Sequence, residues 1–192
     1  MRRGQISLEL MFLLMIFMLI LVYSINNVSF SKGPSVEVLK AQIALESKSL
    51  ANAISNTISQ VYAQGPGSKA TTYVKLTYLK DSGYLRKAFS GDSIFITYIN
   101  GTCVGVPTGN ELYSSGDNKN FFCTRSLYLR DLSNTPTFPS TLNLDGKSVN
   151  GMVIKAENLH GTLKVVVEWI PGDGNTWQYD DGVLRINIDP GG

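Results

Sequence analysis

Apolar residues are most concentrated in a single run near the N-terminus. Residues 6–25 are apolar except for Ser7, Glu9 and Ser24. As a helix that rises about 1.5 Å per residue, this run would extend about 30 Å, which is the thickness of a bilayer's hydrocarbon core. The pattern therefore predicts a transmembrane helix.

Basic residues on one side of this run indicate its orientation. Arg2 and Arg3 precede the run, whereas the next basic residue is Lys32. Because basic residues favour the cytoplasmic side of a membrane, we expect a cytoplasmic N-terminus and an extracytoplasmic remainder. Residues 23–27 read YSINN and offer no small-residue cleavage site, so an ordinary secretory signal is not favoured.

A second helical pattern follows a break. The Gly33–Pro34 pair interrupts the first pattern, because proline lacks an N–H and disfavours the α conformation in the residue before it. We expect a kink or a melted stretch at this pair. Over residues 35–64, apolar residues recur every three or four positions, namely Val36, Leu39, Ile43, Leu50, Ile54, Ile58 and Val61. This stripe predicts an amphipathic helix that packs against a folded head. The alanines of the same helix would either let neighbouring helices approach or face only the protein's own core.

Short β-like runs bounded by turn residues begin at Ser68. They are rich in β-branched and aromatic residues and cover 72–79, 93–99, 121–129, 151–156, 163–170 and 183–188. The run at 163–170 has apolar residues on both faces, which predicts a central strand. With the N-terminal helix, these runs predict an α+β fold whose head is a mainly antiparallel sheet.

The segments between these runs read as turns and loops. Residues 158–161 and 180–182 are typical of hairpin turns between neighbouring strands. Residues 105–120 and 133–142 are rich in Gly, Asn, Ser and Pro and are predicted to form exposed loops.

Composition and charge narrow the possible functions. The chain has 192 residues, of which 43% are hydrophobic, so it can form one folded domain plus an anchor. Its formal net charge is +2, and Arg2 and Arg3 account for all of it. This charge is too small for a nucleic-acid-binding surface, so nucleic acid is not an expected partner.

No set of residues points to catalysis, a cofactor or a metal. His160 is the only histidine, and no nucleophile or base is arranged around it in the sequence. Residues 172–175, followed by Asp180 and Asp181, could supply oxygen ligands, but their spacing does not match a calcium-binding EF-hand loop. We therefore expect a protein that is not an enzyme.

The two cysteines, Cys103 and Cys123, both lie in the predicted external head. An oxidising compartment favours their pairing, and a bond that closes a loop of about twenty residues would stabilise the fold by about 3 kcal/mol. We expect this disulfide. Two buried free thiols are the alternative.

Two kinds of residue in the predicted external part could carry a modification or bind a ligand. Asn27 and Asn100 each begin a glycosylation sequon, and Asn100 is the better candidate because it lies at a predicted strand boundary away from the membrane. Trp169, Trp177 and Tyr179 would either fill the core or form a carbohydrate- or surface-binding patch.

Fixed positions at the start of the apolar run form a motif. Gln5, Ser7, Glu9 and Leu13 match every fixed position of Gln-x-Ser-x-Glu-x-x-x-Leu. On these residues, the N-terminus resembles archaeal type IV pilin-like proteins with a class III signal peptide. The resemblance implies that a membrane-embedded prepilin peptidase cleaves between Gly4 and Gln5 and leaves the hydrophobic helix on the mature protein. It covers about the first 25 residues.

The acidic residue of the motif, Glu9, is the one charged residue in the apolar run. An acidic side chain in mid-membrane costs about 2.5–3.5 kcal/mol by insertion scales. Cleavage would give Gln5 an α-amino group with a reference pKa of about 7.7–8.0. By resemblance to pilins, Glu9 would neutralise this amine on a neighbouring subunit and fix the filament's register. Alternatively, Glu9 lies hydrated at the headgroup level of a plain anchor.

The resemblance implies a division of the chain into functional parts. Residues 1–4 would be a cytoplasmic leader, and residues 5–64 an N-terminal helix. Within this helix, residues 5–25 would form the membrane and filament-core segment, and residues 35–64 the amphipathic part. Residues 68–192 would be an extracellular β-rich head.

Two functions from different classes remain open. In the first, the chain is a pilin that joins copies of itself or related pilins in a helical filament for surface adhesion. Its partners would be the prepilin peptidase, the membrane before assembly and the pilus assembly machinery. In the second, it is a membrane-anchored or minor, tip-located surface-binding protein rather than the major subunit.

Overall fold

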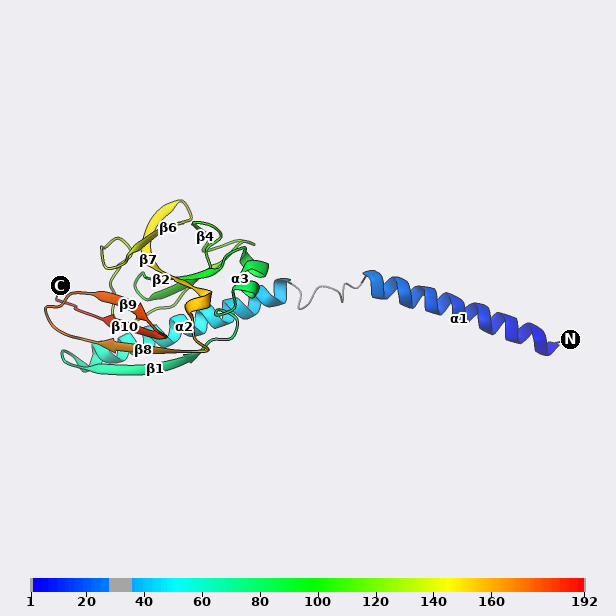
Figure 1. Ribbon diagram of the computed structural model, residues 1–192, viewed down its shortest axis with the longest axis horizontal. Helices are drawn as coiled ribbons and strands as arrows, with labels where there is room; N and C mark the ends of the chain where they lie inside the picture. The colour runs from blue at the N-terminus through cyan, green and yellow to red at the C-terminus, as the bar shows by residue number, and fades with distance from the viewer. Residues whose placement is uncertain (1, 28–35, 192) are drawn as a thin grey trace. The chain divides into compact units, whose positions relative to one another are not determined.

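The chain forms two compact units, Met1–Ser35 and Val36–Gly192 (Figure 1). The structure is a computed structural model that describes residues 2–27 and 36–191, with the side chains of residues 9–24 and 36–191. The predicted break at Gly33–Pro34 lies outside the described residues.

In the first unit the structure describes helix α1 (Arg2–Asn27). The abundance of Leu and Met, which are good helix formers, and the lack of proline or glycine after Gly4 favour a continuous helix here. In the part of the chain that the structure describes, no helix meets both the length and the apolarity needed to cross a membrane. Residues 6–8 and 25 of the predicted transmembrane run lie outside the described side chains.

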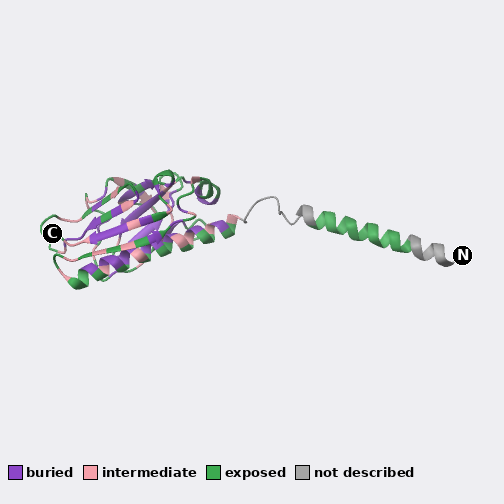
Figure 2. Cartoon of the chain, turned by 60° about the horizontal axis from the view of Figure 1, so that its bottom comes forward, coloured by how far each residue is buried: buried purple, intermediate pink, exposed green. Residues whose placement is uncertain are grey.

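Helix α2 (Val36–Gln64) begins the second unit and carries the predicted amphipathic stripe. Six of the seven stripe residues are at most 1% exposed, namely Leu39, Ile43, Leu50, Ile54, Ile58 and Val61. Figure 2 shows buried and exposed residues alternating along the helix, so one face packs on the sheets. The helix ends before Gly65, whose φ of 89° is a left-handed conformation that glycine adopts without strain.

A four-stranded sheet has the order β1–β8–β10–β9. Its strands are β1 (Lys69–Lys75), β8 (Thr162–Glu168), β10 (Val183–Asn187) and β9 (Thr176–Asp180). Strand β8 pairs antiparallel with β1 and parallel with β10, and β9 pairs antiparallel with β10. The prediction of a central strand at 163–170 is therefore confirmed.

The predicted hairpin at residues 180–182 is also confirmed. Asp180 pairs with Val183, so Asp181 and Gly182 form a two-residue turn between β9 and β10. Both turn residues have positive φ, 41° for Asp181 and 77° for Gly182, as the twist of a tight hairpin requires.

A six-stranded sheet has the order β4–β6–β7–β2–β3–β5. Its strands are β4 (Glu111–Leu112), β6 (Ser140–Leu144), β7 (Lys147–Lys155), β2 (Ser93–Tyr98), β3 (Thr102–Gly105) and β5 (Phe121–Cys123). All pairs are antiparallel except β4 with β6. The predicted α+β class with mostly antiparallel strands is confirmed, although the strands divide between two sheets.

The structure differs from the sequence prediction in several connections. Residues 158–161 are not a hairpin turn, because the chain there leaves β7 through the 3₁₀ turn η1 (Ala156–Asn158) and enters β8 of the other sheet. The loop predicted at 133–142 contains the start of β6, and the loop predicted at 105–120 contains β4. These short strands are polar because one side of each is exposed, so they lack the apolar alternation that marks longer strands.

Two further elements depart from the pattern. The strand predicted at 121–129 ends at Cys123. Helix α3 (Ser82–Phe89) is not predicted, since it is short and half of it faces solvent. Its N-terminus is capped by Asp81, whose carboxylate accepts hydrogen bonds from the backbone N–H of Gly83 at 2.8 Å and of Tyr84 at 3.2 Å.

The main core lies where α2 and both sheets meet, and aromatic residues fill part of it. Trp177 is only 4% exposed, and its ring centroid lies 5.3 Å from that of Phe138 and 5.9 Å from that of Tyr98. Trp169 and Tyr179 pack against the same core. Core packing is therefore confirmed for Trp177, whereas Trp169 and Tyr179 are half-buried against that core, and a binding patch stays a prediction.

Tyr98 anchors the middle of this core. It is fully buried, and its hydroxyl donates a hydrogen bond of 2.7 Å to the carbonyl oxygen of Tyr128. Burial raises the pKa of Tyr98 well above its usual range, because the phenolate would lose its hydration. Burial also raises the pKa of Tyr128.

These raised values predict a loss of stability in alkali. Tyrosines in the unfolded chain ionise near a pKa of about 10, whereas buried Tyr98 keeps its proton. Above that pH the unfolded state binds fewer protons than the folded state, so the free energy of unfolding falls as pH rises.

We predict that Tyr98→Phe lowers the free energy of unfolding by about 1 kcal/mol at pH 7, through loss of the hydrogen bond. The same variant should lose less stability than the wild type between about pH 10 and 11. Denaturant titrations at each pH measure both effects. Tyr73→Phe is the matched control, since Tyr73 is 65% exposed. An alkaline loss identical in wild type and Tyr98→Phe would contradict the assignment.

Candidate functional site

The motif residues lie in the N-terminal part of α1. Gly4 and Gln5 fall in its first turns, and Gln5 and Glu9 are four residues apart, which places them on the same side of a helix. Leu13 continues that side after another four residues. The side chains of Gln5 and Ser7 lie outside the described part, whereas those of Glu9 and Leu13 are described and exposed.

The rest of α1 presents an apolar surface. Between Leu10 and Tyr23, the exposed fractions of the large apolar side chains range from 39% for Leu21 to 72% for Met11. All described side chains of the helix are exposed (Figure 2). An apolar patch of this extent marks an interaction site, and a helix that is apolar on every side is normally buried by other surfaces.

Glu9 is the one charged side chain among those that the structure describes in α1, which run from Glu9 to Ser24. It is exposed, at the N-terminal border of the apolar surface. When lipid or protein covers that surface, the carboxylate must either reach water or meet a cation, because desolvating an unpaired charge is costly. Its position one helical turn from Gln5 places it near the predicted new N-terminus.

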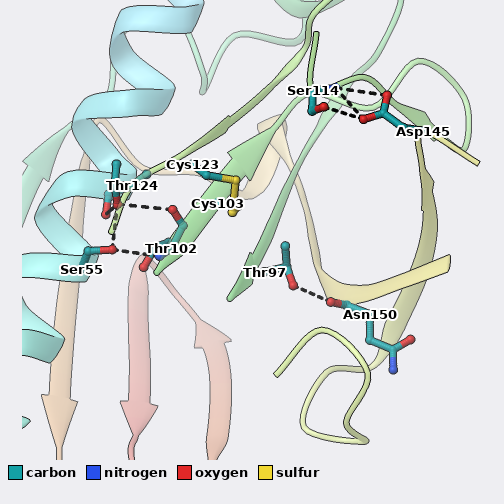
Figure 3. Close-up of a disulfide and its surroundings, with 10 residues drawn as sticks. Ser55, Thr97, Thr102, Cys103, Ser114, Cys123, Thr124, Asp145 and Asn150 are labelled. Atoms are coloured by element: carbon teal, nitrogen blue, oxygen red, sulfur yellow. Dashed lines mark hydrogen bonds between the residues drawn. A yellow bond between two sulfur atoms is a disulfide. The ribbon is translucent and has the colours of Figure 1, made fainter. Parts of the chain in front are cut away.

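The head contains the predicted disulfide (Figure 3). Cys103 of β3 lies directly opposite Cys123 of β5, and their sulfur atoms are bonded. Cys103 is fully buried and Cys123 is exposed. The disulfide closes a loop with a sequence separation of 20, which holds the edge strand β5 against β3.

Hydroxyl groups connect this pair of strands to α2. The Oγ of Ser55 accepts a hydrogen bond from the backbone N–H of Thr102 at 2.8 Å and lies 2.8 Å from Oγ1 of Thr124 (Figure 3). One turn along α2, Ser59 Oγ accepts from the backbone N–H of Leu127 at 3.0 Å and lies 3.0 Å from Ser126 Oγ. The disulfide therefore lies beside a hydrogen-bonded contact between helix and sheet.

Sequence reasoning missed this polar contact. Ser55 and Ser59 are four residues apart on the inner face of α2, where a purely apolar stripe was the expectation. The sequence does hold one indication of this contact. The two serines have the same four-residue spacing as the apolar stripe, which places small hydroxyl residues beside it on the helix. Such residues allow a close approach and satisfy backbone groups at the same time.

The better sequon candidate, Asn100, lies between β2 and β3. It is exposed, and its φ of 56° is left-handed, a conformation that asparagine tolerates better than most residues. Thr102, the third residue of the sequon, is fully buried. The side chain of Asn27 lies outside the described part. Glycosylation at both positions stays a prediction.

Other candidate chemistry does not assemble. Within the described residues, no three His, Cys, Asp or Glu side chains are grouped to hold a metal ion. The loop at 172–175 is instead fixed by Asp189, whose carboxylate accepts from the backbone N–H of Gly172 at 3.0 Å. His160 is exposed, and its Nε2 lies 3.6 Å from the carboxylate of Asp181.

Comparison with known proteins bears on the N-terminus alone. Residues 2–28 match the family model of the class III signal peptide. No curated protein and no solved structure matches the chain. The class III signal peptide has a type IV pilin-like N-terminus and implies processing by a prepilin peptidase. It marks the chain as membrane-targeted and surface-exposed, in the manner of pilin-like proteins.

We predict that replacing both cysteines, Cys103→Ser with Cys123→Ser, lowers the free energy of unfolding of the full chain in detergent by about 3 kcal/mol. The loss of the cross-link enlarges the conformational freedom of the unfolded chain. Urea titrations with and without reductant measure the change. Reductant should lower the stability of the wild type and leave the double variant unchanged. Equal stabilities of wild type and double variant without reductant would contradict a structural disulfide.

Proposed function

We propose that this chain is a structural subunit, a pilin, of an archaeal type IV-like pilus that serves surface adhesion. A prepilin peptidase cleaves it between Gly4 and Gln5, and the mature chain polymerises through α1. The observation that carries the proposal is the position of the exposed apolar helix directly behind the processing motif.

The side chains of α1 suit both the membrane-inserted precursor and the assembled filament subunit. Before assembly, lipid covers the apolar side chains between Leu10 and Tyr23, and Arg2 and Arg3 hold the leader in the cytoplasm. After assembly, the same side chains of neighbouring copies or related pilins cover one another. Burial of apolar surface contributes about 25 cal/mol per Å², so a helix that is exposed all round gains from either environment.

Glu9 supplies the register of assembly. Cleavage leaves an α-amino group on Gln5, which is largely protonated near neutral pH. Among apolar helices, this cation can form an ion pair with the Glu9 carboxylate of a neighbouring subunit. A subunit that is out of register would bury both charges unpaired at a cost of several kcal/mol, which biases the filament toward one axial position.

The folded head supports an extracellular position. It contains a disulfide, which persists in oxidising compartments, and its own core formed by α2 and both sheets. The pilus assembly machinery and the prepilin peptidase are the partners that this role requires. In the alternative role the chain stays membrane-anchored, or it is a minor, tip-located surface-binding protein rather than the major subunit.

We predict that the protein recovered from its cells begins at Gln5 and that Glu9→Gln is still processed but does not enter filaments. Mass spectrometry of the N-terminal peptide and electron microscopy of sheared filaments test the two statements. Glu37→Gln is the matched control, because Glu37 is an exposed acidic residue at the start of α2. It should be processed and assembled normally.

Different results bear on different parts of the proposal. Protein that retains Met1 would contradict processing. Filaments built from Glu9→Gln at the wild-type level would contradict the pairing. If deletion of the chain left filaments intact but reduced adhesion, the chain would be a minor, tip-located subunit.

A further inference from the structure

Strand β9 presents an unpaired edge. It is the last strand of the four-stranded sheet, where its neighbour is β10. Asp180 and Val183 flank the two-residue turn, so they form the pair that exchanges both main-chain hydrogen bonds. The ladder then turns the N–H and C=O groups of Trp177 and Tyr179 away from β10. Within the described residues, no main-chain group of another element bonds to them.

The C-terminal half of β7 forms a second open edge. β7 pairs with β6 up to Gly151, whereas Met152–Lys155 pair with β2 on the other side. Leu144 and Lys147 flank the β6–β7 turn, so the main-chain groups of Lys147 point toward β6. Every second residue of β7 points the same way, so the N–H and C=O groups of Val153 point toward the side that β6 leaves free.

A groove lies between these two open edges. It has a volume of about 470 Å³ and is lined by Pro139, by residues 152–154 of β7 and by residues 177–180 of β9. Val153 is 38% exposed, so the groove is accessible from solvent. Its walls therefore combine apolar side chains with open main-chain groups.

One side chain of the groove lacks a hydrogen-bond partner. Trp177 is 96% buried, since its exposed fraction is 4%, and its indole N–H has no acceptor in the described part of the chain. A buried donor without an acceptor costs about 1–3 kcal/mol, and few such groups persist in folded proteins. Because this nitrogen is covered by the core, the fold itself carries the cost.

We propose that the groove binds an extended peptide segment of another polypeptide, which adds as a strand to the edge of β9. A peptide backbone offers N–H and C=O groups at the spacing that Trp177 and Tyr179 present along the edge of β9. The opposite edge of this sheet, β1, carries Lys69 and Lys75 at its ends, which discourage strand addition. β9 has no lysine. This inference concerns the head and holds whether or not α1 polymerises.

The test uses the full-length protein in detergent and a display library of linear peptides. Enriched peptides are resynthesised, and their affinities are measured by fluorescence anisotropy. Val153→Arg places a long charged side chain in the groove and should weaken binding by at least about tenfold. Ser148→Arg is the matched control, because Ser148 is exposed on the same strand outside the groove. It should bind as the wild type does.

A second arm needs no protein variant and therefore does not depend on the folding of Val153→Arg. N-methylation of backbone amides within the bound segment leaves the side chains unchanged but removes donors, so it should weaken binding by at least about tenfold. The proposal is overturned if no peptide is enriched, if enriched peptides bind Val153→Arg as tightly as wild type, or if N-methylation leaves affinity unchanged.

Discussion

The uncovered apolar surface of α1 is the constraint on which the rest of the molecule depends. The described side chains of this helix are exposed from Glu9 to Ser24, and Glu9 is the one charged residue among them. Exposure of such a surface to water is unfavourable, so lipid or protein must cover it. A helix apolar on every side does not select a single partner face, and the charge at its N-terminal end then becomes the element that can define a register.

The second unit buries its apolar stripe in a core of its own. Its helix α2 directs an apolar stripe inward and shares one core with both sheets. The Ser55 contact and the Cys103–Cys123 disulfide hold β3 and β5 beside that helix. The division between the units, after Ser35, thus separates a helix with an exposed apolar surface from a unit with its own buried core.

The elements with a long apolar period were predictable from the sequence, and the polar or short ones were not. α2 and the central strand β8 follow from spacing, because their buried faces repeat every three to four or every two residues. β4, β6 and α3 are short and half exposed, so tertiary pairing rather than local pattern creates them. The processing motif was visible because fixed residues carry it. The Ser55 and Ser59 contact and the open edge of β9 depend on partners distant in sequence, which no local pattern encodes.

Cross-linking through α1 in sheared surface filaments tests the central claim most directly. Leu14→Cys introduces a thiol on the apolar surface, where Leu14 is 56% exposed, and the described part of the chain has no other free cysteine. A short bismaleimide joins two thiols, so it should convert the filament variant into covalent dimers, while the same variant dispersed in detergent stays monomeric. Recovery of monomers alone from cells and from sheared material would contradict a filament core made of α1.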